Sequence, residues 1–161
     1  MVQLGVKSTF TQDGVLLEKT APAKTFRWDF SDCPDLTQTV AVVLAGLKIE
    51  GELTGIESLK IKETDRVLAL QNELKKIGAE LIETEPNHTY KVTRFFETTG
   101  ILVDGTPVAG APVIETYDDH RMAMAFAPVA MLRDVIIKEP GVVAKSYPSY
   151  WDDLGKVVEI N

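Results

Sequence analysis

The sequence lacks the features that mark secreted and membrane proteins. It contains one cysteine, Cys33, in 161 residues, so no disulfide can form within the chain. It contains no run of about 18 consecutive apolar residues, and no membrane span is predicted. The opening residues, MVQLGVKSTF, have neither the basic start nor the long apolar stretch of a secretory signal. Together these absences lead us to expect a cytoplasmic protein.

Positive charge is also scarce. The 17 lysines and arginines are outnumbered by 24 aspartates and glutamates, which gives a formal net charge of −7. Nucleic-acid-binding proteins usually present a basic face, so we expect no nucleic-acid partner. A small anionic ligand is not excluded, because a local cluster of cations can form a positive pocket on an acidic protein.

Metal and nucleotide motifs are missing as well. The two histidines, His88 and His120, stand 32 positions apart, and no cysteine lies at ligand spacing beside them. No glycine-rich phosphate loop of the GxxxxGK type occurs in the sequence. We therefore expect no metal site and no phosphate-loop nucleotide site.

The sequence does contain enough apolar residues for a packed core. Hydrophobic residues make up 45% of the chain and charged residues 25%, which is typical of one globular domain. The clearest pattern covers residues 64–77, where Val67, Leu70, Leu74 and Ile77 recur at spacings of three, four and three. This spacing places the four side chains on one face and predicts an amphipathic helix.

The remaining periodicity predicts a mixture of short strands and helices. Alternating residues with turn signals indicate hairpins, and apolar blocks with capping residues indicate helices. Proline at position 128 should kink or end the helix that contains it. We expect hairpins over residues 6–19 and 79–92, helices over 31–47, 117–132 and 146–160, strands over 54–61 and 134–140, and a less regular strand-and-loop stretch over 97–116.

The chain also contains an internal repeat. LGVKSTFTQDGVLL, from Leu4, resembles IGAELIETEPNHTYKV, from Ile77, and LKIKETDRV aligns with VVAKSYPSY so that Lys62 matches Lys145. The repeating unit is strand–helix–strand–helix–hairpin. The chain opens at Leu4-Gly5, where this unit predicts the end of a helix, so we infer a C-terminal piece of a longer protein. A short N-terminal coil that happens to contain Leu-Gly is the alternative.

Charged residues gather where predicted strands lead into helices. A helix N-terminus offers free N–H groups and a partial positive charge, and it therefore suits anion binding. If the repeats pack side by side in parallel, all of these helix starts point to one edge. The residues concerned are Asp35; Lys62, Glu63 and Arg66; Asp119, His120 and Arg121; and Lys145.

Such a set suits a substrate with two or three negative charges that undergoes proton transfer. Arginine forks bind carboxylate or phosphate through paired hydrogen bonds, and lysine acts as a point charge on phosphate. Carboxylates close to these cations stay ionised and can move protons. Each residue taken singly also has an ordinary interpretation: Glu63 complements a helix dipole, His120 with Asp119 forms a cap, and Asp35 is a common first-turn acid.

Taken together, these motifs resemble a known family. LKIKETDRVLALQNELKKIGAE, TYDDHRMAMAFAPVAM and PGVVAKSYPSYWDDL closely resemble the C-terminal part of 5-enolpyruvylshikimate-3-phosphate synthases. CPDLTQTVAVVLA is similar to that family's helix with a proline–aspartate start. The resemblance runs from about Leu4 to about Leu154, nearly the whole chain.

The resemblance implies an α+β (α/β) fold. Each of the family's two lobes is built from three βαβαββ units, with helices packed in the centre and sheets outside. Residues 1–161 would then form part of the C-terminal lobe: the hairpin of one unit, one full unit and most of the last. This expectation agrees with the truncated phase of the internal repeat.

The resemblance also implies an activity and roles for three residues. The family transfers the enolpyruvyl group of phosphoenolpyruvate to the 5-hydroxyl of shikimate 3-phosphate and releases phosphate, in the glyphosate-targeted pathway to aromatic amino acids. No metal or organic cofactor is implied. Asp35 resembles the aspartate that contacts the shikimate hydroxyls and helps to deprotonate the attacking one. Glu63 resembles the acid that protonates the enol methylene, and His120 is expected to orient Glu63 or to assist at the phosphate.

The ligand-binding roles fall mainly to cations. Arg66 and Arg121 are similar to the arginines that grip the phosphoenolpyruvate carboxylate, and Lys145 is similar to the lysine near its phosphate. Lys62 resembles a contact to the shikimate ring oxygens. Ser58 stands where members of the family often carry an asparagine, and its hydroxyl can still hydrogen-bond at that position.

The motifs of the family's other lobe do not occur in this sequence. That lobe supplies the serines, glutamine, arginine and lysine that hold the shikimate phosphate, and positioning of both reactants accounts for much of such catalysis. We therefore expect phosphoenolpyruvate and shikimate 3-phosphate to react only when the missing N-terminal lobe is present, with no turnover from this chain alone. A stand-alone anion-binding module and a structural domain with capped helices are the alternatives.

Overall fold

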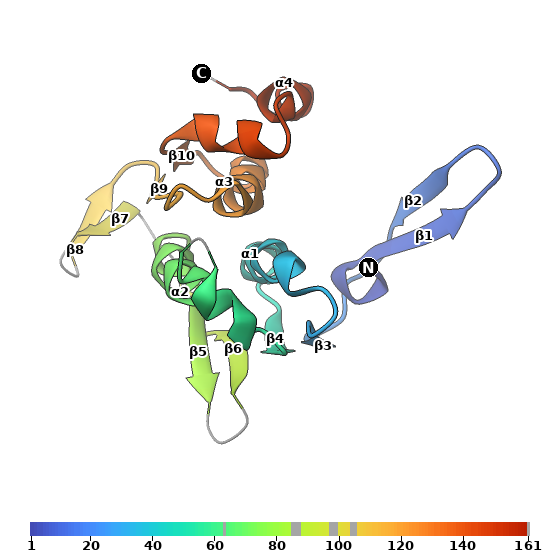
Figure 1. Cartoon of the computed structure of the whole chain (residues 1–161), viewed down its shortest axis with the longest axis horizontal. Coiled ribbons are helices and arrows are strands. Elements are labelled where there is room, and N and C mark those ends of the chain that lie inside the picture. Colours follow the sequence, from blue (N-terminus) through green and yellow to red (C-terminus); the bar gives the residue numbers. More distant parts are fainter. Residues whose placement is uncertain (63, 85–87, 97–99, 104–105, 161) are drawn as a thin grey trace.

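The computed structural model describes residues 1–62, 64–84, 88–96, 100–103 and 106–160 (Figure 1). Its α-helices are α1 (Thr37–Leu47), α2 (Arg66–Lys76), α3 (His120–Phe126) and α4 (Tyr150–Leu154). Its 3-10 helices are η1 (Val2–Leu4), η2 (Pro34–Leu36), η3 (Glu57–Ile61), η4 (Ala127–Met131) and η5 (Pro140–Lys145). No helix within these described ranges has the length and apolar character needed to cross a membrane.

The largest sheet of the described chain has four strands. Its order is β3 (Thr25–Asp29), β4 (Glu50–Thr54), β6 (Thr89–Thr93) and β5 (Glu80–Thr84); β3 and β4 run parallel, and β6 is antiparallel to both of its neighbours. Three further strand pairs are β9 (Val113–Ile114) parallel to β10 (Ile136–Ile137), and the antiparallel hairpins β1 (Val6–Phe10) with β2 (Val15–Lys19) and β7 (Gly100–Val103) with β8 (Thr106–Ala109).

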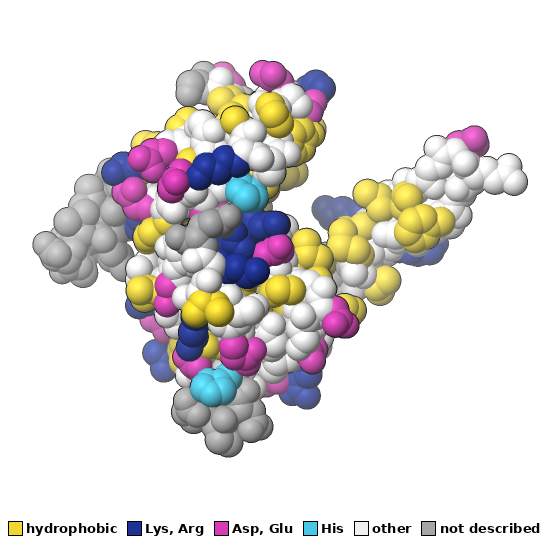
Figure 2. Space-filling model, viewed as in Figure 1, with side chains coloured by type: hydrophobic (Ala, Val, Ile, Leu, Met, Phe, Trp, Pro, Cys, Tyr) yellow, Lys and Arg dark blue, Asp and Glu magenta, His cyan; other side chains and the backbone are white. Residues whose placement is uncertain are grey.

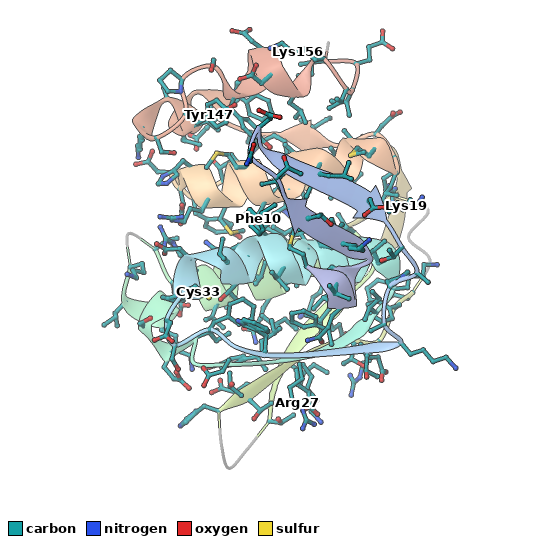
Figure 3. The ribbon with its side chains drawn as sticks, turned by 90° about the vertical axis from the view of Figure 1, so that its right-hand side faces the viewer. Phe10, Lys19, Arg27, Cys33, Tyr147 and Lys156 are labelled. Atoms are coloured by element: carbon teal, nitrogen blue, oxygen red, sulfur yellow. The ribbon has the colours of Figure 1, made fainter. Side chains whose placement is uncertain are left out.

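The helices occupy the middle of the molecule. Helix α1 packs against both α2 and α3, and the four-stranded sheet covers the side of α1 and α2 that faces away from α3 (Figure 1). Figure 3 shows the layers from the side, from Tyr147 and Lys156 near α4, through Cys33 before α1, to Arg27 on the sheet. The β1–β2 hairpin projects away from this body (Figure 1). The expected α+β class, with central helices and outer sheets, is confirmed.

The internal repeat is confirmed by the order of the elements. Strand β3, helix α1, strand β4, helix α2 and the β5–β6 hairpin form one unit, and β9, α3, β10, η5 and α4 follow the same order in the next. Lys62 directly follows η3 and Lys145 is the last residue of η5, so the two aligned lysines hold nearly equivalent places. Gly5 and Gly78, which open the two aligned hairpins, both have left-handed φ angles, 82° and 93°.

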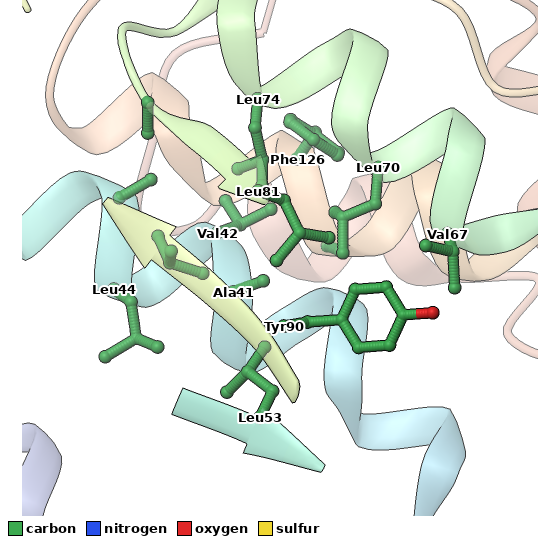
Figure 4. Packing of buried hydrophobic residues seen from close by; sticks show 14 of the residues in the cluster. Ala41, Val42, Leu44, Leu53, Val67, Leu70, Leu74, Leu81, Tyr90 and Phe126 are labelled. Atoms are coloured by element: carbon green, nitrogen blue, oxygen red, sulfur yellow. The ribbon is translucent and has the colours of Figure 1, made fainter. Parts of the chain in front are cut away.

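The core lies between the three central helices and the inner face of the sheet. Strand β6 alternates half-buried and buried residues, so Tyr90 and Val92 point inward towards the helices. Leu70, Tyr90 and Phe126, all at most 1% exposed, bring α2, β6 and α3 into one cluster (Figure 4). Burying a side chain of this size contributes about 1.5–3 kcal/mol, so this cluster fixes how the helices sit on the sheet.

The strand expected over residues 54–61 is wrong. The strand is β4, at residues 50–54, and residues 57–61 form the 3-10 helix η3. Gly55 ends the strand with a left-handed φ of 70°, and a Cβ there would lie 2.3 Å from an Asp29 carboxylate oxygen. Beyond it, Ile56 and Leu59 are both fully buried at helical spacing, which a strand could not achieve.

The other expected elements are confirmed with shifted ends. The helix expected over 31–47 begins at Pro34 as η2, and the helix over 64–77 spans Arg66–Lys76. The helix over 117–132 begins at His120 and becomes 3-10 at Ala127, one residue before the proline that was expected to kink it. The strand over 134–140 and the helix over 146–160 shrink to β10 and α4; the turn of the second hairpin, residues 86 and 87, lies outside the described residues.

Candidate functional site

Three helix starts meet on one face of the molecule. Asp35 lies in η2 before α1, Arg66 is the first residue of α2, and Arg121 lies in the first turn of α3. Lysine and arginine side chains gather there with a histidine beside them, where α1, α3 and η3 come together (Figure 2). The sequence-based expectation that separate strand-to-helix junctions converge is confirmed for these three residues.

Arg66 is the buried centre of this cluster. Its side chain is only 3% exposed, and its guanidinium donates to two carboxylates. Nε donates to Asp119 Oδ2 at 2.5 Å, Nη2 lies 3.4 Å from Asp119 Oδ1, and Nη1 donates to Asp35 Oδ1 at 2.9 Å. A buried charge is costly without partners, so this two-point grip holds the guanidinium in one orientation.

Asp35 connects the buried arginine to a more accessible one. Its second oxygen, Oδ2, lies 2.8 Å from Nη2 of Arg121, so this carboxylate is shared between two guanidinium groups. The side chains of Asp35 and Arg121 are 39% and 34% exposed, whereas that of Asp119 is fully buried. A ligand reaching the cluster from solvent would therefore meet Asp35 and Arg121 first.

Local capping explains why these residues stand where they do. Asp65 caps α2 by accepting the N–H of Leu68 at 3.0 Å, and Asp119 caps α3 by accepting the N–H of Arg121 at 2.9 Å. Aspartate is favoured at both places because its carboxylate satisfies a free N–H group at the positive end of the helix. Asp119 thus has two functions, since it caps α3 and also holds Arg66.

Lys145 approaches from the second repeat unit. Its Nζ donates to the Asp118 carboxylate at 2.8 Å and to the Asp118 carbonyl oxygen at 2.9 Å. Asp118 is the neighbour of Asp119, so Lys145 lies next to the cluster through this adjacent residue. The Lys145 side chain is half exposed and remains accessible from solvent.

The remaining expected site residues surround this cluster less directly. His120 opens α3 and is half-buried, while Ser58 in η3 and Lys62 directly after it are exposed. Glu63, the expected proton donor, lies outside the described residues. The structure therefore joins Asp35, Arg66 and Arg121 in one network, and the roles of these three and of the other site residues stay predictions.

Two buried acids, Asp119 and Glu73, support the network from behind in ways that the sequence did not predict. Asp119 was expected among the gathered helix starts and, taken singly, as part of a cap, but its ion pair with Arg66 was not predicted. Glu73, a buried acid in the middle of α2, was not singled out at all, although Tyr117 and the N–H of Glu115 donate to it. No local motif announces such contacts, because their partners lie 42–53 positions apart in sequence.

Within the described residues, no group of three or more His, Cys, Asp or Glu side chains is arranged to hold a metal ion. What the cluster does offer is two arginine forks, a nearby lysine and a shared carboxylate. This combination is suited to holding a small anion with carboxylate or phosphate groups beside an ionised acid.

Comparison with known proteins identifies the family to which the chain belongs. The fold is similar to that of a solved EPSP synthase from Acinetobacter baumannii, with a TM-score of 0.62 and 22% identity, over 98% of this chain and 37% of that one. The family model for EPSP synthase (3-phosphoshikimate 1-carboxyvinyltransferase) matches residues 1–154. The chain belongs to the EPSP synthase family.

Curated relatives carry the same family name. The chain is 46% identical over 156 residues to a 3-phosphoshikimate 1-carboxyvinyltransferase of Bacteroides fragilis, which covers 96% of this chain and 36% of the relative. It is 37% identical to that of Cellvibrio japonicus, over 93% of this chain and 33% of the relative, and 31% identical to that of Methanospirillum hungatei, over 98% and 34%. The chain thus spans about a third of the length of these relatives.

Proposed function

We propose that this chain is part of the C-terminal lobe of a 3-phosphoshikimate 1-carboxyvinyltransferase. In the complete protein it would help to transfer the enolpyruvyl group of phosphoenolpyruvate to the 5-hydroxyl of shikimate 3-phosphate, with release of phosphate. The observation that carries the proposal is the network of Asp35, Arg66 and Arg121, assembled from three helix starts in a member of this family. A cytoplasmic location is part of the proposal and agrees with the single cysteine.

Each side chain takes a role that suits its position in this proposal. Arg121 and Arg66 would bind the phosphoenolpyruvate carboxylate, and Lys145 would lie near its phosphate. An incoming anion would compete with Asp35 for Arg121, releasing the aspartate to accept a proton from the attacking hydroxyl. Glu63 would protonate the methylene carbon, with His120 nearby, and Lys62 and Ser58 would contact the shikimate moiety.

Most of the catalytic surroundings would come from the other lobe. The described cluster is reachable from solvent through Asp35, Arg121 and Lys145, so this chain encloses a ligand on one side only. With only half of the site present, we expect a Kd for phosphoenolpyruvate of about 1 mM or weaker. This Kd corresponds to a binding free energy of about 4 kcal/mol. We therefore expect no turnover from the chain by itself.

A hybrid enzyme tests the proposal directly. The segment of the Bacteroides fragilis relative that aligns with this chain is replaced by this chain, and phosphate release from phosphoenolpyruvate and shikimate 3-phosphate is measured. The hybrid should turn over, and Asp35→Asn should lower kcat at least about a hundredfold, the usual contribution of a general base. Asp13→Asn, in the β1–β2 turn, is the matched control and should change kcat less than twofold.

Two results would contradict the proposal. One is a folded hybrid that binds phosphoenolpyruvate without releasing phosphate, which would favour an anion-binding module. The other is full activity in the Asp35→Asn hybrid, which would leave the network with a structural role only. Growth of a transferase-deficient bacterium without aromatic amino acids provides an independent readout for both.

A further inference from the structure

A buried carboxylate lies behind the candidate site without belonging to it. Glu73 sits in the middle of α2 and is only 1% exposed. Its Oε1 accepts the Tyr117 hydroxyl at 2.8 Å, and its Oε2 accepts the N–H of Glu115 at 3.1 Å and lies 2.7 Å from Nζ of Lys76. A buried acid with three donors is a fixed anchor, because losing any one of them leaves charge poorly solvated.

The segment that Glu73 holds has an unfavourable backbone. Tyr117 and Asp118 both adopt left-handed conformations, with φ angles of 55° and 54°. For residues with a side chain this conformation is disfavoured, and two in succession must be held by surrounding contacts. The N–H of Asp119 closes the turn by donating to the Thr116 carbonyl at 2.9 Å, and Glu73 holds the residues on the near side of this turn.

Helix α2 therefore grips the same segment at two points. Arg66 and Glu73 lie seven residues apart on α2, which is nearly two full turns, so they share one face about 10 Å apart along the axis. Glu73 binds residues 115 and 117, and Arg66 binds residue 119. The closed turn at residues 116–119 is therefore held to α2 by a contact on each side.

We propose that Glu73, acting through Tyr117, is a positioning residue for the candidate site. By fixing the left-handed turn, it places Asp119 against Arg66 and Asp118 against Lys145. Weakening this anchor lets the turn relax and frees the Arg66 guanidinium from its single orientation. The affinity of the site for an anion then falls. The inference builds on the proposed function, since it explains how that site is held ready.

The chemistry of the Tyr117 hydroxyl suits a permanent anchor. Burial, followed by the hydrogen bond to Glu73, raises the pKa of Tyr117 to about 12. The phenol thus remains a neutral donor to the carboxylate throughout the range in which the protein would work. Its hydrogen bond to a charged acceptor belongs to the stronger class.

The first test uses the chain itself and needs no turnover. Tyr117→Phe and Glu73→Gln each remove part of the anchor, and the Arg66 Nε–H signal is followed by ¹⁵N NMR and hydrogen exchange. Loss of a hydrogen bond to a charged group should speed Arg66 Nε–H exchange about tenfold or more. Tyr150→Phe is the matched control, because its part-buried hydroxyl donates to the Met124 carbonyl at 3.0 Å, away from α2, and it should leave the Arg66 signal unchanged.

The second test uses the hybrid enzyme described above. Tyr117→Phe should raise the KM for phosphoenolpyruvate about tenfold and change the KM for shikimate 3-phosphate less than twofold, whereas Tyr150→Phe should change neither. An unchanged Arg66 signal in both Tyr117→Phe and Glu73→Gln would overturn the inference. If the unsubstituted hybrid has no turnover, the proposed function fails while the Arg66 signal still decides whether Glu73 positions the site.

Discussion

The β5–β6 hairpin is half of a four-stranded sheet, whereas the β1–β2 hairpin pairs only with itself among the described residues. The sequence repeat relates the two, and both open with a left-handed glycine. Leu81 in β5 is 3% exposed, while Leu17 in β2 is 61% exposed and Phe10 in β1 is 82% exposed. Figure 3 labels Phe10 and Lys19 on this hairpin, and Figure 1 shows that the hairpin lies outside the stacked layers.

The difference lies in the neighbouring strand and not in the hairpin. Strand β6 pairs with β4, which sets Val92 opposite Gly51 and Tyr90 opposite Leu53 and presses the apolar face of the hairpin onto the helices. Strand β2 has no such neighbour in the described chain, so its leucines remain in solvent. Local sequence makes a hairpin, and a third strand decides whether the hairpin joins a core.

The largest effect that would sharpen this comparison comes from one substitution made in both hairpins. Leu81→Ala should lower the free energy of unfolding by about 2–5 kcal/mol, because it empties a packed position in the core. Leu17→Ala removes the same atoms from solvent and should cost less than about 0.5 kcal/mol. Urea unfolding of the two variants, followed by circular dichroism, measures both values, and similar costs would show that the β1–β2 hairpin is packed in solution.

Much of this arrangement was predictable from local patterns. Helical spacing of apolar residues located α2, and alternation with turn residues located both hairpins. The order of these elements then placed Asp35, Arg66 and Arg121 at equivalent strand-to-helix junctions. Because parallel strands bring such junctions to the same edge, their convergence could be predicted without a structure.

What could not be predicted depends on how one helix rotates against another. Asp119 meets Arg66 only because α2 and α3, which both pack on α1, have their first residues turned towards each other, and no spacing in the sequence encodes that rotation. The strand expected at 54–61 failed because the apolar residues Ile56 and Leu59 were assigned to a strand, although their spacing of three places both on the buried side of a 3-10 turn. The burial of Glu73 was not predicted, because in the sequence this acid cannot be distinguished from the exposed polar residues of the same amphipathic helix.

A second, smaller effect concerns the two glycines. Gly78→Ala forces an L-residue into a left-handed conformation between α2 and β5, and should lower the free energy of unfolding by about 1–2 kcal/mol. Gly5→Ala meets the same restriction, and its Cβ would lie 2.9 Å from the Thr20 carbonyl oxygen. Because its hairpin stands outside the core, we expect little change in global unfolding and a faster exchange of the Thr20 N–H, which donates to the Gly5 carbonyl. Equal global losses would mean that both hairpins unfold with the core.

The smallest effect is a pH dependence carried by the β5–β6 hairpin. The hydrogen bond from His88, aided by Lys60, lowers the pKa of Glu83 from 4.5 to about 2. A carboxyl whose pKa is lower in the folded state stabilises that state above its unfolded pKa, and this stabilisation is lost as the pH falls from 4.5 towards 2. Glu83→Gln should therefore flatten the acid limb of stability in this window, with a small amplitude because the group is near solvent and screened by salt.

Unfolding curves between pH 5 and 2 measure this limb, and Glu18→Gln, in the exposed ion pair between β1 and β2, is the matched control. An equal flattening in both variants would show that the buried hairpin has no electrostatic advantage over the free one.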